Sequence, residues 1–207
     1  MHSNEFKKEM EHLICLICYT AHMKLFVISD IHGYPAALKK ALAVFDASGA
    51  DALLITGDYM YHGPRNGVHE GYDGPAVAEL LNAYKDRIIG IRGNCDSEVD
   101  QMLLGFPMLA PYTRQLLADG TSLFMHHGHT ITEEQIASWC AEGSIVISGH
   151  THVAVLEKRD GRVFLNPGSV SLPKGGSKAG YALIDTDTGS ISLCELDTGA
   201  VYKTLEN

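Results

Sequence analysis

Residues 23–32 read Met-Lys-Leu-Phe-Val-Ile-Ser-Asp-Ile-His. The apolar run in the first half of this stretch predicts a buried β-strand, and the Ser-Asp that follows predicts a polar turn at its carboxyl end. A helix is predicted from about Pro35 to Ala47, with proline in its first turn, and a second buried strand from Asp51 to Thr56. The chain therefore begins with alternating strands and helices.

Farther along, the pattern changes from this alternation to strands that follow one another. Helices are predicted at 76–84, 97–104 and 132–140, and strands at 87–91, 114–117, 122–126, 144–148, 153–158 and 163–165. Turns at 187–189 and 197–199 then separate three further alternating runs that reach the end of the chain. An α/β (α+β) fold of two facing, mixed β-sheets flanked by helices fits this order better than one doubly wound sheet.

The size and composition of the chain are those of a soluble globular protein. It has 207 residues, of which 45% are hydrophobic and 20% charged, so we expect a single domain over residues 23–207. No run approaches the roughly 20 apolar residues that a membrane-spanning helix needs. The formal net charge of −9 disfavours a long nucleic acid as partner.

Residues 1–22 differ from the rest of the chain. Their charged and apolar parts resemble a signal peptide in outline, but acidic residues flank the apolar run and no clear cleavage site follows. We interpret them as an extension, either an over-extended reading frame or an added helix.

The five cysteines, at 15, 18, 95, 140 and 194, lack the spacing of a disulfide framework, which predicts a reducing compartment, the cytoplasm. Cys15 and Cys18 form a Cys-x-x-Cys pair, but no second pair and no βαβ pattern accompany it to indicate metal or redox chemistry.

Five short polar clusters each follow directly on a predicted apolar strand, where α/β sheets collect functional groups. Each cluster alone is an ordinary turn sequence, but together they supply carboxylate, imidazole and amide ligands, which favour Mn²⁺, Fe²⁺ or Zn²⁺ over a thiolate site. Two ions need a bridging ligand, and Asp58 is the candidate because a carboxylate has two oxygens. The clusters are Asp30-Ile-His32, Gly57-Asp58, Gly93-Asn94, His127-Gly-His129 and Gly149-His150-Thr-His152.

In this order the clusters resemble the signature of the calcineurin-like metallophosphoesterase superfamily, which is Asp-x-His, Gly-Asp, Gly-Asn-His-Asp/Glu, His and Gly-His-x-His. The match covers residues 23 to about 171. His62-Gly-Pro-Arg-Asn66, Arg92-Gly-Asn-Cys-Asp-Ser-Glu98 and Asn166-Pro-Gly-Ser169 suggest a small bacterial and archaeal phosphodiesterase group within it. The resemblance implies a four-layer αββα sandwich and a hydrolase with two divalent metal ions. Mn²⁺ is favoured, with Zn²⁺, Fe²⁺ and Ni²⁺ as alternatives.

The same resemblance implies the role of each candidate ligand. One metal ion would be bound by Asp30, His32 and His152, the other by Asn94, His127 and His150, and Asp58 would bridge them. Asp58, His32 and His152 are then the catalytic residues, and a hydroxide shared by the two cations attacks the phosphorus without a protein nucleophile. The expected substrate is a small phosphodiester, and association of identical chains is left open.

Cys95 departs from the family pattern, which has histidine after the asparagine. In the family's phosphatases that histidine assists near the leaving group, and general acid catalysis is worth about 10²- to 10⁴-fold. Its absence favours phosphodiesters whose leaving groups need little protonation, and leaves Asp96 as a cap at the start of a helix. Cys95 either lines the substrate pocket or packs beneath it as a small hydrophobe.

Arg65 and His129 are the remaining candidates for substrate binding. Arg65 either clamps a phosphate or is a solvated loop residue, and His129 either supports a metal ligand or simply ends a strand. The segment from Asn166 to Ser169 either approaches the metals from the second sheet or only forms a turn.

Two other functions compete with the phosphodiesterase. A phosphomonoesterase or protein phosphatase on the same scaffold is disfavoured by Cys95, and neither the size nor the loops favour a protein-phosphatase groove. A non-catalytic scaffold protein with a decayed metal site would lack ligands, whereas this chain retains all seven.

Overall fold

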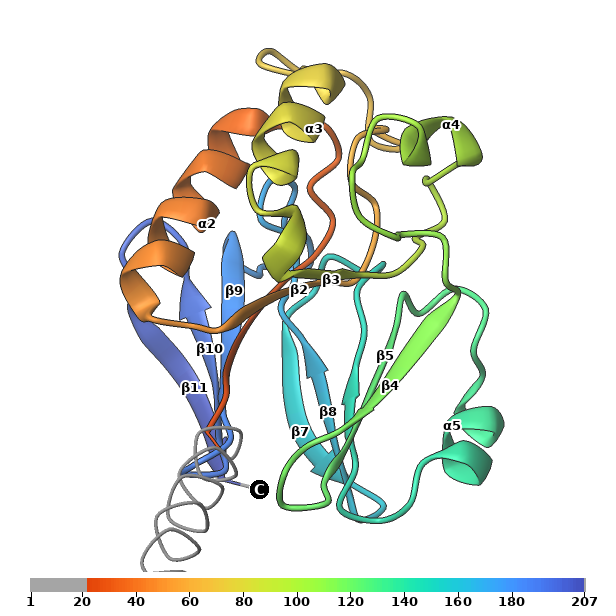
Figure 1. The fold of residues 1–207 in the computed structure, drawn as a ribbon, viewed down its shortest axis with the longest axis vertical. Helices are drawn as coiled ribbons and strands as arrows, with labels where there is room; N and C mark the ends of the chain where they lie inside the picture. Colours follow the sequence, from red (N-terminus) through yellow and green to blue (C-terminus); the bar gives the residue numbers. More distant parts are fainter. Residues whose placement is uncertain (1–21, 207) are drawn as a thin grey trace, which may run out of the picture.

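Two β-sheets face each other in the computed structural model, which describes residues 22–206 (Figure 1). The Cys15–Cys18 pair and all but the last residue of the predicted extension at 1–22 lie outside this range. Within it, no helix is both long and apolar enough to cross a membrane.

The first sheet contains six strands in the order β11-β10-β9-β1-β2-β3. Its centre is parallel, because β1 pairs with β2 and β2 with β3 in the same direction, whereas β9, β10 and β11 pair antiparallel. The strands are β1 (Lys24–Ile28), β2 (Ala52–Ile55), β3 (Ile88–Gly90), β9 (Gly180–Asp185), β10 (Ser190–Glu195) and β11 (Val201–Glu206).

The second sheet contains five strands in the order β4-β5-β6-β8-β7. The inner strands β5, β6 and β8 are parallel, and the edge strands β4 and β7 are antiparallel to their neighbours. The strands are β4 (Tyr112–Leu116), β5 (Ser122–His126), β6 (Ile145–Ile147), β7 (Val155–Arg159) and β8 (Arg162–Asn166). The predicted pair of mixed sheets is therefore confirmed.

Alternating side chains of β1 explain why this strand is apolar from Leu25 to Ile28. Leu25 and Val27 enter a core shared by the two sheets, where they join residues such as Met125 of β5. Phe26 and Ile28 point to the other face and pack with the helices. Because both faces are covered, these four positions have no solvent side and need no polar residue.

Helices cover the outer faces of both sheets, as the four-layer prediction requires (Figure 1). The helices α2 (Pro35–Ser48) and α3 (Gly74–Asn82) pack on the first sheet through one apolar cluster. A 3-10 helix at Lys85–Arg87 leads into β3. The layer over the second sheet is thin, because it consists of α5 (Glu133–Trp139), whose Ile136 packs on Phe124 and Val146.

The helix predicted at 97–104 is shorter than expected. It ends after a single turn, α4 (Glu98–Gln101), which Ser97 caps through reciprocal bonds with Asp100. The Gln101 amide donates to the carbonyls of Leu104 and Phe106, and so binds the following chain in a non-helical path.

The polar clusters follow β1, β2, β3, β5 and β6 as predicted, and the loops that carry them lie very close together. Gly57 follows β2 with a φ of +102°, and a Cβ atom there would overlap the backbone of Gly93, which follows β3. Glycine at position 57 therefore allows two of the candidate ligand loops to touch.

Replacing Gly57 by alanine should cost more stability than the same change at Gly49, which has a positive φ of 67° but open space around it. Gly49→Ala adds only backbone strain, about 1–2 kcal/mol, whereas Gly57→Ala adds overlap as well, for a total of about 2–5 kcal/mol. Urea denaturation of both variants measures the difference in the free energy of unfolding. Equal losses would show that the two loops do not need their close approach.

Candidate metal centre

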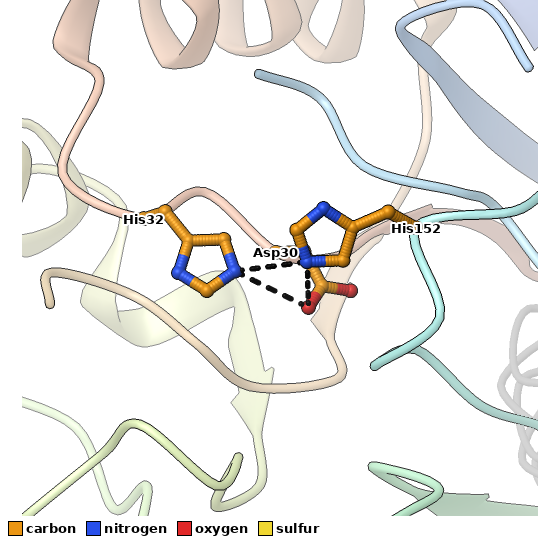
Figure 2. A group of neighbouring side chains, drawn as sticks. All are labelled: Asp30, His32 and His152. Carbon is orange, nitrogen blue, oxygen red and sulfur yellow. Dashed lines mark hydrogen bonds and ion pairs between the residues drawn. The ribbon is translucent and has the colours of Figure 1, made fainter. Parts of the chain in front are cut away.

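Three side chains from the loops after β1 and β6 converge on one point (Figure 2). The Nε2 atoms of His32 and His152 lie 3.0 Å apart, and Asp30 Oδ1 lies 3.6 Å and 3.3 Å from them. Ligands that sit about 2.1 Å from one ion are themselves about 3.0–3.4 Å apart. The spacing of these three atoms therefore fits a common metal ion.

The oxygen of Asp30 that faces the imidazoles has no hydrogen bond within the described chain, although it is buried. The other oxygen accepts from the Ser29 hydroxyl and from the His150 N–H, at 3.0 Å. Buried polar atoms are seldom left without a partner in native proteins. A cation between Asp30 and the two imidazoles would provide that partner.

A second group of ligand atoms surrounds the side-chain oxygen of Asn94. This oxygen lies 2.9 Å from His127 Nε2 and 2.5 Å from His150 Nδ1. Asp58 lies between the two groups, with Oδ2 3.5 Å from both His32 Nε2 and His127 Nε2. The structure thus brings all seven predicted ligands together, with Asp58 between the two groups.

Backbone carbonyls set the orientation of three of the imidazoles. The Nδ1 atoms of His32, His127 and His152 lie 2.8, 2.7 and 2.6 Å from the carbonyl oxygens of Tyr61, Thr56 and Leu172. An N–H on Nδ1 donates to the carbonyl and leaves the lone pair of Nε2 toward the centre, as in many metal sites. These carbonyl partners could not be predicted from the sequence, because any residue type can supply a backbone carbonyl.

The buried carboxylates of Asp30 and Asp58 favour positive charge on the groups beside them. Burial alone would raise the pKa of Asp30, but the adjacent imidazoles of His152 and His32 outweigh it and lower the pKa below its usual range. Burial lowers the pKa of His127, yet Asp58 raises it to about 9. A proton on His127 therefore balances carboxylate charge at neutral pH, and a metal ion that replaced this proton would release it on binding.

The ligand loops are held in an unusual backbone conformation. Among the described non-glycine residues, positive φ values occur at Asp30, His32, Asp58, His150, His152 and Asp160, so five of the six are candidate ligands. Such conformations cost about 1–3 kcal/mol each and persist only where the surroundings enforce them. Strain is thus concentrated at the centre.

Asp96 is one of the groups that enforce this geometry, and the prediction that it caps a helix is wrong. Its buried carboxylate accepts from the backbone N–H groups of Asp58, Tyr59 and Gly93, at 2.8, 2.9 and 2.6 Å. The cap of α4 is Ser97, the next residue. Burial and the nearby Asp58 raise the pKa of Asp96 to about 6.

The segment from Asn166 to Ser169 ties the loops of the two sheets to each other. The Asn166 amide donates to the Gly149 carbonyl at 2.7 Å, and the Ser169 hydroxyl donates to the Asp30 carbonyl at 2.6 Å. The segment therefore does more than form a turn, because it contacts the backbone of two of the loops that carry the candidate ligands.

The three candidate substrate-binding residues divide between two cavities that share Asn94. Arg65 and Cys95 line a cavity of about 550 Å³ beside the ligands, and His129 lines one of about 340 Å³ with Arg92. Burial and the charge of Asp58 raise the pKa of Cys95 to about 12, so its thiol keeps its proton at neutral pH.

Lys174 also lines the larger cavity, although the sequence analysis did not predict it as a site residue. It lies in a glycine-containing loop after β8, and no motif marks it.

The chain shares its sequence and fold with known phosphoesterases. Residues 23–189 match a family model described as calcineurin-like phosphoesterase superfamily domain. Phosphodiesterase YfcE of Escherichia coli K12 is 47% identical over 169 residues, which cover 82% of this chain and 91% of that protein. Phosphodiesterase MJ0936 of Methanocaldococcus jannaschii is 23% identical over 151 residues, 70% of this chain and 83% of that protein.

A solved structure of Yfce, described as a phosphoesterase from E. coli, has the same fold. It matches with a TM-score of 0.84 at 42% identity, and the match covers 89% of this chain and 99% of that one.

Replacing Asp96 by asparagine should loosen the loop that carries Asp58. The amide turns one accepting oxygen into a donor that faces backbone N–H groups, and leaving a buried donor unsatisfied costs about 1–3 kcal/mol. We expect Asp96→Asn to lower the free energy of unfolding by that amount in urea titrations, and to weaken Mn²⁺ binding in calorimetry.

The matched control is Asp73→Asn. The Asp73 carboxylate caps α3 by accepting from the Ala76 N–H, a role that asparagine performs equally well. If the two variants were equally stable and bound Mn²⁺ alike, the three bonds of Asp96 would not support the centre.

Proposed function

The chain belongs to the calcineurin-like phosphoesterase superfamily, and we propose that it hydrolyses small phosphodiesters with two bound divalent metal ions. The observation that carries this proposal is the position of Asp58. One oxygen of its carboxylate lies 3.5 Å from imidazoles of both ligand groups. A carboxylate placed in this way suits a bridge between two ions.

The first ion would be held by Asp30, His32 and His152, and the second by Asn94, His127 and His150. The unsatisfied oxygen of Asp30 and the spacing of the ligand atoms support the first site. The convergence of both imidazoles on the Asn94 oxygen supports the second. Because the donors are oxygen and nitrogen atoms, we favour Mn²⁺, with Zn²⁺, Fe²⁺ and Ni²⁺ as alternatives.

When bound there, two divalent metal ions would lower the pKa of a water molecule that attacks the phosphorus. They would also offset the charge that develops on the phosphoryl oxygens. The protein's own contribution is orientation. The carbonyls of Tyr61 and Leu172 hold His32 and His152 by their Nδ1 atoms, and the Cys95 N–H donates to Asp58 at 2.8 Å. Arg65 lines the adjoining cavity, where its guanidinium suits a phosphoryl oxygen.

Two features favour a diester over a monoester. The Cys95 thiol, whose pKa is raised to about 12 by burial and by Asp58, is a poor proton donor at neutral pH, so the leaving group must depart with little protonation. Two cavities also share Asn94 as a lining residue, which gives room for two ester groups. A phosphodiesterase is also the printed description of the relative from E. coli at 47% identity.

Protein stripped of metal should not turn over bis(p-nitrophenyl) phosphate, and added Mn²⁺ should restore turnover. Asp58→Asn should abolish it, because a neutral amide cannot bridge two cations, whereas the exposed Asp86→Asn control should keep wild-type rates. Release of p-nitrophenol measures both. A lack of metal-stimulated turnover of any aryl phosphate ester would exclude the proposed function, and an active Asp58→Asn protein would exclude the bridge.

Cys95→His should shift the preference from diesters toward monoesters. The imidazole restores a proton donor beside the leaving group, and we expect the kcat/KM ratio of bis(p-nitrophenyl) phosphate to p-nitrophenyl phosphate to fall by about 10²-fold. Cys95→Ala, which adds no donor, serves as the control for pocket size. An unchanged ratio in Cys95→His would show that residue 95 does not select between the two substrates.

A further inference from the structure

Two cations, Arg65 and Lys174, line the larger cavity, and among the described residues neither pairs with a carboxylate. Of the two, Lys174 has its charged group held by a side-chain hydrogen bond. The ammonium group of Lys174 donates to the side-chain oxygen of Asn66 at 2.8 Å, and within residues 22–206 no carboxylate lies within 4.0 Å of it. Lys178, four residues later on the same loop, instead pairs with Glu195 at 2.8 Å. Lys174 therefore presents a net positive charge in a chain whose formal net charge is −9.

Hydrogen bonds at both ends hold Lys174 across the cavity. Its backbone N–H donates to the carbonyl of His152, a candidate ligand, at 3.0 Å. On the opposite side, the Asn66 amide donates to the His62 carbonyl at 2.8 Å and fixes the oxygen that receives the ammonium group. The amine therefore has a set position relative to the metal centre, although its side chain is exposed.

The carboxylates that line the same cavity are already engaged. Asp58 stands between the two ligand groups, Asp96 accepts from three backbone N–H groups, and Asp100 accepts from Ser97. An ammonium group has three donors, and Asn66 takes one of those of Lys174. Two donors and the full charge are thus left for a molecule that enters the cavity.

We propose that Lys174 binds a second anionic group of the substrate. The preferred substrate is then a phosphodiester in which one ester group carries a further phosphate or carboxylate, and Lys174 determines specificity while the metal ions hold the reacting phosphate. The cavity volume of about 550 Å³ lies in the range that accommodates molecules of nucleotide size, well beyond one phosphate. This inference rests on the proposed phosphodiesterase activity.

The experiment compares two chromogenic diesters that differ by one anionic group. They are thymidine 5′-(p-nitrophenyl phosphate) and the same compound with a 3′-phosphate, each assayed with Mn²⁺-loaded protein. For the wild type we expect KM to be roughly tenfold lower for the 3′-phosphorylated diester, the effect of one charge-assisted contact. The preference should shrink at 1 M salt, because the contact is exposed to solvent.

Three variants assign this preference to Lys174. Lys174→Met keeps the length of the side chain without its charge, and should remove the tenfold difference. Asn66→Asp keeps an oxygen that accepts from the ammonium group but neutralises its charge with a carboxylate, so this variant should also lose the tenfold difference. Lys178→Met changes a lysine of the same loop that is bound to Glu195, and should retain it.

Each contrary outcome has a distinct meaning. Equal KM values for the two diesters in the wild type would overturn the second anionic site. An equal loss of kcat/KM for both diesters in Lys174→Met would overturn it too, because the amine would then act on the reacting phosphate. Turnover of either diester keeps the proposed function in both cases, whereas turnover of neither would remove the proposed function and this inference together.

Discussion

The contact of one carboxylate with imidazoles from both sheets is the constraint on which the centre depends. Asp58 follows β2 in the first sheet, and its Oδ2 lies 3.5 Å from His32 of the same sheet and from His127, which follows β5 in the second. These distances hold only while the sheets pack face to face on their shared apolar core. Side chains such as Leu25 and Met125 therefore act on the chemistry through the spacing of the sheets, without touching the ligands.

Buried polar bonds convert this approximate spacing into a fixed geometry. Asp96 connects the loops after β2 and β3. Asn166 binds Gly149 in the loop after β6, and Ser169 binds Asp30 in the loop after β1. Five candidate ligands have positive φ values, a conformation that such a network can hold at the cost of some stability. Backbone strain held by buried hydrogen bonds is typical of sites where precise ligand placement matters more than stability.

The strands and the ligand set could be predicted from the sequence because both depend on local patterns. The strand at 122–126 was predicted with its exact bounds, and the polar clusters lie at strand ends as expected. The failures at the site involve bonds between distant residues. Asp96 was assigned to a helix that follows it, whereas its partners at Asp58 and Tyr59 lie almost 40 positions earlier. Lys174 has no motif, because its position depends on Asn66, 108 residues away.

The order of strands in the first sheet also has a consequence for how the molecule is made. β1 lies between β2 and β9, and the Met23 N–H donates to Thr186, 163 residues later. On the ribosome, the partner of one edge of β1 is therefore synthesised only after all seven candidate ligands have been synthesised. Contacts of such long range form slowly, and an unpaired strand edge invites aggregation meanwhile. The nascent chain thus carries every ligand before the sheet that supports them can close.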